Sequence, residues 1–375
     1  MCSFNFYNTK KLISVVLFLI FTICSCKFDN VNQIQSREII LVGDIKNLPT
    51  KKIYLTDAHK WDILLDSSEI INNKFQFNLD TFKLPEPFLA SVCILTATNK
   101  IEQLAVFNYK RTNTKDTFSN TGFMLSFGKT ELSGDFNYKF HRVSIVPNKE
   151  NDLGFDLKTE EFGSRKNIKF IKETIQSNPS SYFLLYKLYQ NKSLYSETEL
   201  KDILGLFEKK ILNSKTAMDL MQYSSYLPAK GAAFPNSQLT NFKGENELLF
   251  NDSAKITMLI FWASWCGPCR LEIPELKNIR TKFPAQILSM KSISIDEDAS
   301  NWQKALNEEY MPWQQFLAPY KDLVKIKAQF TVNAIPVIIF LDKNKNELKR
   351  FVGYSENNVI MYDKFINEYL TKAGK

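Results

Sequence analysis

The pattern of apolar and polar positions divides the chain into successive parts with different periodicities. Between residues 38 and 148, short strand-like runs alternate with turns that contain Asn, Gly or Pro, and residues 74–79 alternate strictly. Strict alternation buries one face of a strand, and short strands at close intervals are typical of a small sandwich or barrel. We therefore predict an antiparallel, sandwich-like all-β domain over residues 37–150.

Helical spacing replaces this pattern after residue 151. Ile168, Ile171 and Ile175 fall on one helix face, and Pro179 suits the first turn of a second helix. Ser196 opens a further helical stretch. These features predict a helical linker domain over residues 151–230, which spaces or orients the β domain against the rest of the chain.

The last part of the chain, residues 231–375, alternates buried strands with helices. Apolar runs predict strands at residues 256–261, 287–295 and 337–341, and a return strand at 347–352. Helical patterns follow the first strand and cover residues 296–310, 320–330 and 357–370. The order strand, helix, strand, then a hairpin and a final helix predicts an α/β domain.

The first residues are expected to direct export. Lys10 and Lys11 precede an apolar stretch, residues 12–23, that is short for a membrane span. Ile23 and Ser25 before Cys26 resemble a bacterial lipobox, which implies cleavage after residue 25 and lipidation of Cys26. Residues 1–25 are then a lipoprotein signal peptide and residues 26–36 a tether. An ordinary signal peptide is the alternative, and Cys24 is a weaker anchor because Ile23 precedes it directly.

Composition and charge exclude some classes of function. The 375 residues are 44% hydrophobic and 23% charged, which is ordinary for globular domains. The net charge of +8 is spread along the chain without a dense basic block interleaved with aromatic residues, so nucleic-acid binding is not expected. His59 and His141 are the only histidines and no second close cysteine pair exists, so we predict no metal site.

The six cysteines fall into distinct classes. Cys2 and Cys24 lie in the signal segment, and Cys93 sits in an apolar run where a buried packing role is expected. Cys266 and Cys269 form the remaining close pair, on the turn between a buried strand and a helix. Orphan N–H groups at a helix N-terminus favour a thiolate at Cys266, which is the form that attacks disulfides. A structural disulfide or half of a zinc site is the alternative.

Residues 231–375 resemble the thioredoxin fold, and more closely its exported TlpA/ResA-like branch. The resemblance is carried by Trp262, by the run from Trp265 to Arg270, by Glu272 and Pro274, and by Ile335-Pro336 before an apolar strand. It implies a thiol–disulfide oxidoreductase whose only redox group is the Cys266–Cys269 pair, with no added cofactor.

The resemblance also implies a role for each matched residue. Cys266 attacks and Cys269 resolves the mixed disulfide. Pro336 follows a cis peptide bond and Ile335 offers its backbone to substrate. The substrate also meets three residues around the cysteines: Trp265, Gly267 and Pro268.

Proton transfer is less well defined by the sequence. Glu272 either accepts the proton of Cys269 or is a solvated helix residue. Many cytosolic relatives carry a buried Asp six residues before the first cysteine, and here that position is Ile260.

The wider resemblance suggests a place in the cell. The β part looks like a DUF4369-like domain, which is often joined to such thioredoxin modules in Bacteroidetes lipoproteins. We expect an envelope-anchored protein facing the periplasm that reduces protein disulfides, in cytochrome c maturation or redox homeostasis, with a membrane electron donor of the DsbD/CcdA type. The anchor is expected in either the inner or the outer membrane. An oxidase or isomerase, or a binding lipoprotein with an accessory thioredoxin module, are the alternatives.

Overall fold

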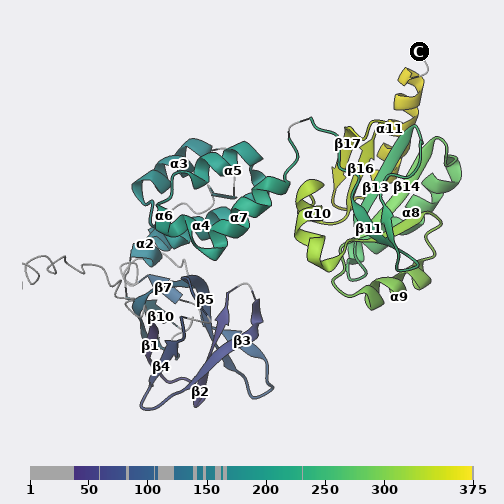
Figure 1. Cartoon of the computed structure of the whole chain (residues 1–375). Coiled ribbons are helices and arrows are strands. Elements are labelled where there is room, and N and C mark those ends of the chain that lie inside the picture. The colour runs from purple at the N-terminus through teal and green to yellow at the C-terminus, as the bar shows by residue number, and fades with distance from the viewer. Residues whose placement is uncertain are drawn as a thin grey trace, which may run out of the picture.

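The computed structural model divides into an N-terminal β region, a helical region and a C-terminal α/β domain (Figure 1). It describes the chain from residue 38 to residue 373 with several gaps. The described ranges are 38–58, 60–81, 84–104, 106–108, 122–137, 142–146, 149–156, 162–163, 167–229 and 231–373. The predicted signal peptide, the tether with Cys26, and both histidines, His59 and His141, lie outside the described residues.

Strands of the described N-terminal region form two sheets that share one apolar core. One sheet has the order β4-β1-β9-β10-β7, and the other β3-β2-β5-β6 with β8 paired to β5. Ile39 and Leu41 of the first sheet pack in the same cluster as Ile53 and Val92 of the second. The strands are β1 (Ile39–Lys46), β2 (Lys52–Asp57), β3 (Lys60–Glu69), β4 (Lys74–Leu79), β5 (Phe88–Leu95), β6 (Ile101–Gln103), β7 (Val106–Asn108), β8 (Phe123–Leu125), β9 (Gly128–Asp135) and β10 (Arg142–Ile145).

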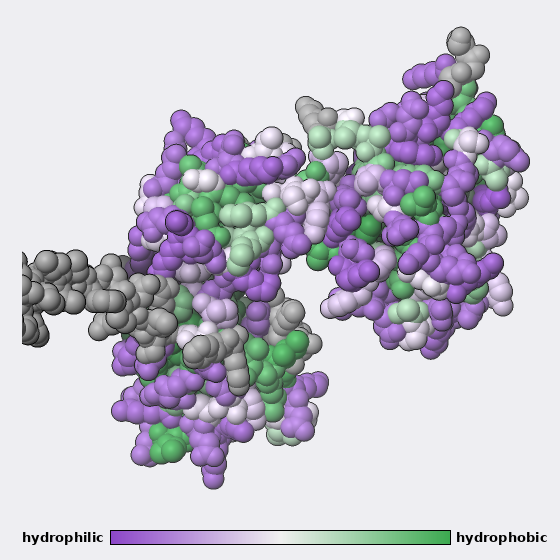
Figure 2. All heavy atoms as spheres, in the orientation of Figure 1, coloured by the Kyte–Doolittle hydropathy of each residue, from purple (hydrophilic) through white to green (hydrophobic). Residues whose placement is uncertain are grey.

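The purely antiparallel arrangement predicted for this region is wrong. Strand β1 pairs in parallel with β9, and β10 pairs in parallel with β7. The alternation of β4 is as predicted, with Phe75, Phe77 and Leu79 buried. Alternation reports which face of a strand is buried but carries no information on the direction of its neighbour. Figure 2 shows an apolar patch over β3, where Ile63, Leu64 and Leu65 are exposed.

Helices occupy most of the chain between the β region and residue 226. Serine side chains cap three of them: Ser181 begins α4, Ser214 begins α7, and Ser196 forms a full capping box with Glu199 at the start of α5. Their apolar faces meet in one core that includes Ile171, Leu184 and Leu220. The helices are α2 (Lys149–Asp156), α3 (Ile168–Ser177), α4 (Tyr182–Gln190), η4 (Lys192–Leu194), α5 (Glu197–Leu204), α6 (Lys209–Leu212) and α7 (Lys215–Tyr226).

The C-terminal domain is built on a seven-stranded mixed sheet of order β12-β11-β15-β14-β13-β16-β17. Every residue of the central strand β13 is buried, as its apolar run predicted. The strands are β11 (Gln238–Asn241), β12 (Asn246–Leu248), β13 (Ile256–Trp262), β14 (Leu288–Ser294), β15 (Gln314–Leu317), β16 (Val337–Leu341) and β17 (Glu347–Val352). The helices are α8 (Gly267–Lys282), α9 (Ala299–Glu309), η5 (Tyr320–Asp322), α10 (Leu323–Gln329) and α11 (Asn358–Ala373).

Helix α10 of this domain contacts α7 of the helical region (Figure 1). Ala328 on α10 is fully buried and belongs to the apolar core of the helical region. The chain leaves α10 toward Val332 and then reaches Ile335 and Pro336. The helical region therefore packs against α10 at Ala328, a few residues before the Ile335-Pro336 segment that leads into β16.

No helix among the described residues is long and apolar enough to cross a bilayer.

Candidate active site

Cys266 and Cys269 are joined by a disulfide at the N-terminus of α8. Cys266 is the N-cap residue, and its sulfur accepts a hydrogen bond of 3.2 Å from the backbone N–H of Cys269. The two residues are only 4% and 3% exposed. On reduction, this N–H and the positive end of the helix dipole stabilise negative charge on the Cys266 sulfur.

Local sequence explains why the cysteines sit at this helix end. Strand β13 ends at Trp262, and helix α8 begins a few residues later. Pro268 suits the first turn of α8, because a backbone N–H at that position would find no acceptor within the helix and proline has none to donate. Pro274 lies inside α8, and the helix continues to Lys282. Pro274 has no N–H to donate, so the helix loses one backbone hydrogen bond a turn beyond the cysteines.

A buried aspartate fixes the loop that leads into the cysteines. Asp296, 2% exposed, accepts hydrogen bonds from the Ser264 backbone N–H (2.9 Å) and the Ser264 hydroxyl (2.6 Å). The hydroxyl of Ser294 also donates to it, at 2.5 Å. Sequence reasoning missed Asp296 as a site residue and assigned it to a helical segment. The signal that was available is a carboxylate placed directly after an apolar strand.

Glu272 is buried rather than solvated. It is 1% exposed, and its Oε1 accepts hydrogen bonds from the Tyr362 hydroxyl (2.6 Å) and from Asn358 Nδ2 (3.1 Å) on α11. Its Oε2 is buried and has no hydrogen-bond partner among the described residues. Burial raises the pKa of Glu272 above its usual value, although the two hydrogen bonds act in the opposite direction. The solvated-residue alternative is therefore wrong.

The position of Glu272 places it on the cysteine face of its helix. It follows Cys269 by three residues, and residues with that spacing are neighbours on a helix surface. Ile260, by contrast, packs in an apolar cluster with Leu276 and Tyr362 and offers no proton acceptor. A buried carboxyl group with a raised pKa, on the helix face that carries Cys269, has the chemistry of a proton acceptor.

The tryptophans on either side of the loop have different environments. Trp262 is 2% exposed and belongs to the core, whereas Trp265 is 67% exposed. Gly267 and Pro268 are also exposed. Three of the predicted substrate-contact residues, Trp265, Gly267 and Pro268, are therefore exposed to solvent next to a buried disulfide. Trp262 instead packs in the same apolar core as the two cysteines.

The Ile335–Pro336 peptide bond is cis, as the resemblance implies. Val337 follows it and pairs with Phe261 in the antiparallel register of β16 and β13. This pairing brings Pro336 beside the end of β13, from which the chain passes into Cys266. Ile335 is half-buried, and the Pro336 carbonyl accepts a hydrogen bond from Gly353. The structure thus brings Ile335 and Pro336 to the same edge of the sheet as the disulfide.

The described residues contain one further cysteine, Cys93, which lies on β5 of the N-terminal β region. Cys93 is a buried free thiol, and burial raises its pKa to about 11, so it stays protonated and inert at neutral pH. Within the described ranges no group of three or more His, Cys, Asp or Glu side chains is placed to hold a metal ion.

The mixed sheet, the cysteine pair at a helix N-terminus and the adjacent cis-proline together define a thioredoxin-like domain. A family model described as "Thioredoxin-like" matches residues 253–347. The thiol-disulfide oxidoreductase ResA of Geobacillus kaustophilus is 24% identical over 124 residues, which are 33% of this chain and 69% of that protein. The thioredoxin-like protein YneN of Bacillus subtilis is 27% identical over 30% of this chain and 66% of its own length.

The solved structures that are similar to this chain cover about the same share of it as these relatives do. The thioredoxin domain of a Bacteroides vulgatus thiol-disulfide oxidoreductase has 23% identity and a TM-score of 0.34, covering 37% of this chain and 99% of that domain. A Bacteroides fragilis thiol-disulfide oxidoreductase has 24% identity and a TM-score of 0.32, covering 36% of this chain and 99% of that chain. Together with the family model, the site makes the C-terminal domain a thioredoxin-like thiol-disulfide oxidoreductase domain, and this domain is similar to the ResA proteins.

Proposed function

We propose that this protein is anchored in the cell envelope, faces the periplasm, and reduces disulfides in other proteins. The observation that carries the reaction is the Cys266 sulfur at the start of α8, which accepts a hydrogen bond from the Cys269 N–H. Export is supported by the apolar segment before Cys26, and disulfide chemistry persists in such compartments.

The reaction consumes the reduced pair and produces its disulfide. The Cys266 thiolate attacks one sulfur of a substrate disulfide, and the other substrate sulfur leaves as a thiolate and takes up a proton. Cys269 then gives its proton to Glu272, attacks the Cys266 sulfur and releases the second substrate thiolate. Two electrons pass to the substrate, so a dithiol donor, of the DsbD/CcdA type in the membrane, must reduce the pair again.

Trp265, Gly267, Pro268 and the backbone of Ile335 form the surface that a substrate meets. They are exposed or half-buried around a disulfide that is itself buried. A substrate chain that pairs with the Ile335 backbone would be held with its disulfide over Cys266. Cytochrome c maturation and general disulfide repair are both tasks that require this type of reductase.

We expect the Cys266–Cys269 couple to be reducing. Equilibration of the full chain with dithiothreitol mixtures, followed by thiol alkylation, should give a potential nearer to about −270 mV than to about −120 mV, the values of thioredoxin and of a strong oxidase. Gly267-Pro268 between the cysteines and Ile335 before Pro336 resemble the residues of reducing members of the family, and this resemblance supports the direction. A value close to the oxidising limit would make the protein an oxidase or isomerase instead.

Replacing Cys26 with serine should release the protein from membranes. A lipid chain adds about 0.8 kcal/mol for each buried CH₂, and serine removes the thiol that carries part of the lipid. The measurement is fractionation of cells that express the wild type or the Cys26→Ser variant, with Cys24→Ser as the matched control. If the Cys26→Ser variant stayed in the membrane fraction and the Cys24→Ser variant left it, the lipidated residue would be Cys24.

The proposed function also includes the N-terminal β region and the helical region as parts of one lipoprotein. We propose that residues 37–150 are a DUF4369-like domain and that the source is a member of the Bacteroidetes. The support is the strand rhythm around Gly43 and Phe75. Gly43 lets the Phe75 ring lie directly against the β1 backbone, because a Cβ at residue 43 would be 2.0 Å from that ring. The helical region would then hold the two outer domains at a fixed spacing.

A further inference from the structure

Asp296 follows β14 and carries a carboxylate that is buried among hydrogen-bond donors. It is 2% exposed, and its Oδ1 accepts a hydrogen bond of 2.6 Å from the Ser264 hydroxyl. Its Oδ2 accepts from the Ser264 backbone N–H at 2.9 Å and from the Ser294 hydroxyl at 2.5 Å. Burial of a carboxylate is costly unless hydrogen bonds replace those lost from water. Because both donor groups of Ser264 bind it, the carboxylate fixes the position and the orientation of that residue.

Ser264 belongs to the tight turn through which the chain reaches Cys266. The Cys266 N–H donates to the Ala263 carbonyl at 3.1 Å, which closes a β-turn with Ser264 and Trp265 at its centre. Just before this turn, the Ile295 N–H donates to the Trp262 carbonyl at 2.9 Å. The end of β14 therefore holds the turn twice, first through the main chain and then through the side chain of the residue that follows Ile295.

The two residues after Ser264 have opposite environments. Trp265 is 67% exposed, whereas Cys266 is 4% exposed and is the N-cap residue of α8. The Cys266 sulfur accepts the Cys269 N–H at 3.2 Å. The favourable effect of a helix N-terminus on a negative charge falls off within the first turn of the helix. Stabilisation of a Cys266 thiolate therefore depends on a turn that keeps the sulfur at the helix end.

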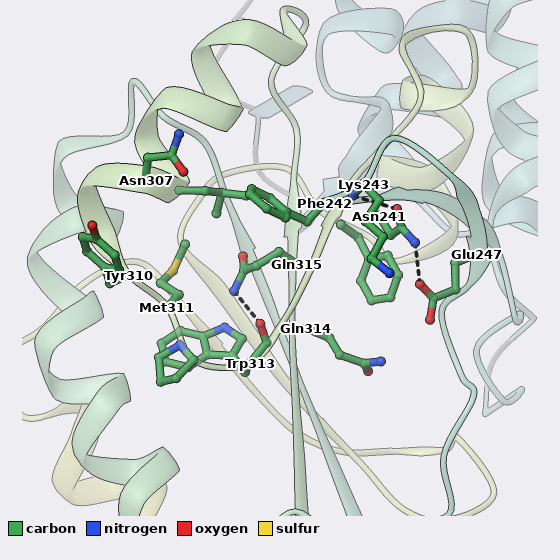
Figure 3. A pocket seen from close by; sticks show the side chains of 13 residues that line it. Asn241, Phe242, Lys243, Glu247, Asn307, Tyr310, Met311, Trp313, Gln314 and Gln315 are labelled. Carbon is green, nitrogen blue, oxygen red and sulfur yellow. Dashed lines mark hydrogen bonds between the residues drawn. The ribbon is translucent and has the colours of Figure 1, made fainter.

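A cavity of about 670 Å³ in the same domain is separate from Asp296 (Figure 3). It lies between residues that follow α9, among them Tyr310 and Met311, and the β11–β12 turn at Phe242. Neither Asp296 nor Ser264 lines it. The hydrogen-bond partners of Asp296 are thus the donors of the turn and of β14, and a ligand in this cavity would not replace them.

Building on the proposed function, in which Cys266 is the attacking thiol, we propose that Asp296 is a positioning residue for that thiol. Through Ser264 it holds the turn of residues 263–266, so that the Cys266 sulfur stays at the N-terminus of α8 when the disulfide is reduced. The oxidised pair is held by its covalent bond to Cys269. The dithiol lacks that bond, and the hydrogen bonds of Asp296 keep the sulfur in the same place.

The negative charge of Asp296 acts on Cys266 in the opposite direction to the hold. A nearby negative charge disfavours a thiolate, so loss of the charge lowers the Cys266 pKa, whereas loss of the hold raises it. The charged residues of α8 next to the cysteines are Arg270, which pairs with two acidic residues of α9, and Glu272, which accepts hydrogen bonds from α11. Variants that leave these groups in place and share the same charge at residue 296 isolate the hold.

The test measures how the rate of Cys266 alkylation by iodoacetamide depends on pH in the reduced full chain. The thiolate displaces iodide, mass spectrometry assigns the modified residue, and the midpoint of the rate profile reports the Cys266 pKa. Asp296→Asn keeps the hold, because its amide oxygen replaces Oδ2 and its NH₂ donates to the Ser264 hydroxyl oxygen. Asp296→Ala loses the hold together with the charge. We expect the midpoint of Asp296→Ala to lie about one pH unit above that of Asp296→Asn, since a hydrogen bond to a charged group is of that order.

Two serine variants form a matched pair that keeps the Asp296 charge. Ser264→Ala and Ser294→Ala each remove one hydroxyl donor to the carboxylate, but only Ser264 lies on the turn before Cys266. The midpoint should be higher in Ser264→Ala than in Ser294→Ala, and Ser294→Ala should match the wild type. Thermal melting monitors folding of every variant, and the serine pair decides the result if Asp296→Ala does not fold.

Equal midpoints in Asp296→Ala and Asp296→Asn would overturn the positioning role, and so would equal midpoints in the two serine variants. Iodoacetamide reacts with the thiolate whatever the direction of electron flow in cells. An oxidising potential of the couple would therefore contradict the reductase function and leave the order of the midpoints as expected. Equal midpoints would instead remove the role of Asp296 and leave the reductase function in place.

Discussion

Cys266→Ser should lose reduction of insulin disulfides down to the background rate of the chemical reductant. The attacking group must be a thiolate, and the serine hydroxyl does not ionise under these conditions. The helix N-terminus that stabilises charge on the sulfur remains in place, since Cys266 is its N-cap and serine is also a good N-cap residue. The loss is therefore chemical, and the variant should melt near the reduced wild type.

The companion change, Cys269→Ser, should trap the reaction halfway. Cys266 still attacks, but no second thiol displaces the substrate, so a mixed disulfide accumulates and is visible on non-reducing gels. Mass spectrometry of the trapped species in cells would identify partners. Cys93→Ser is the matched control, because that thiol is buried and free. If both active-site variants support growth and envelope redox state as the wild type does, the binding-lipoprotein alternative is preferred.

Features encoded in contiguous residues could be predicted from the sequence. The fully buried strands β13 and β16 are continuous apolar runs, and β4 shows strict alternation. The cysteine pair could be placed because a buried strand ends just before it and helical spacing begins just after it. The proline before β16 could be identified because the same resemblance carries it.

Features that depend on distant residues could not be predicted. Burial of Glu272 depends on Asn358 and Tyr362, which lie 86 and 90 residues further along the chain. The Asp296 contact to Ser264 spans 32 residues. Strand β15 has only four residues and no distinctive pattern, so its place between β11 and β14 was missed. Each of these features is fixed by tertiary packing, which overrides local preference.

Glu272→Gln should slow reduction of protein disulfides by roughly 100-fold at neutral pH, the lower limit of the range for loss of a general base. Glutamine keeps an oxygen that accepts from Tyr362 and Asn358, but it cannot take the proton of Cys269. The step affected is attack of Cys269 on the mixed disulfide. Stopped-flow single-turnover reduction of a fluorescent disulfide peptide should therefore show a normal first phase and a slow second phase.

The same substitution should change the dependence of stability on pH. The folded chain holds the Glu272 proton more tightly than the unfolded chain does, because burial raises the folded-state pKa above the reference value of 4.5. Its stability contribution is thus present below about pH 4.5 and is lost as the pH rises through the folded-state pKa. Relative to the wild type, Glu272→Gln should gain melting temperature between pH 4 and pH 8.

Glu275→Gln on the exposed side of α8 provides the control for both measurements. It removes the same charge from the same helix without a buried partner, so neither the second kinetic phase nor the pH profile should change. If Glu272→Gln has a normal second kinetic phase but a changed dependence of stability on pH, Glu272 does not accept the proton of Cys269. Its carboxyl group would then affect folding stability alone. Proton transfer from Cys269 would then pass to solvent, since Ile260 at the alternative position has no ionisable group.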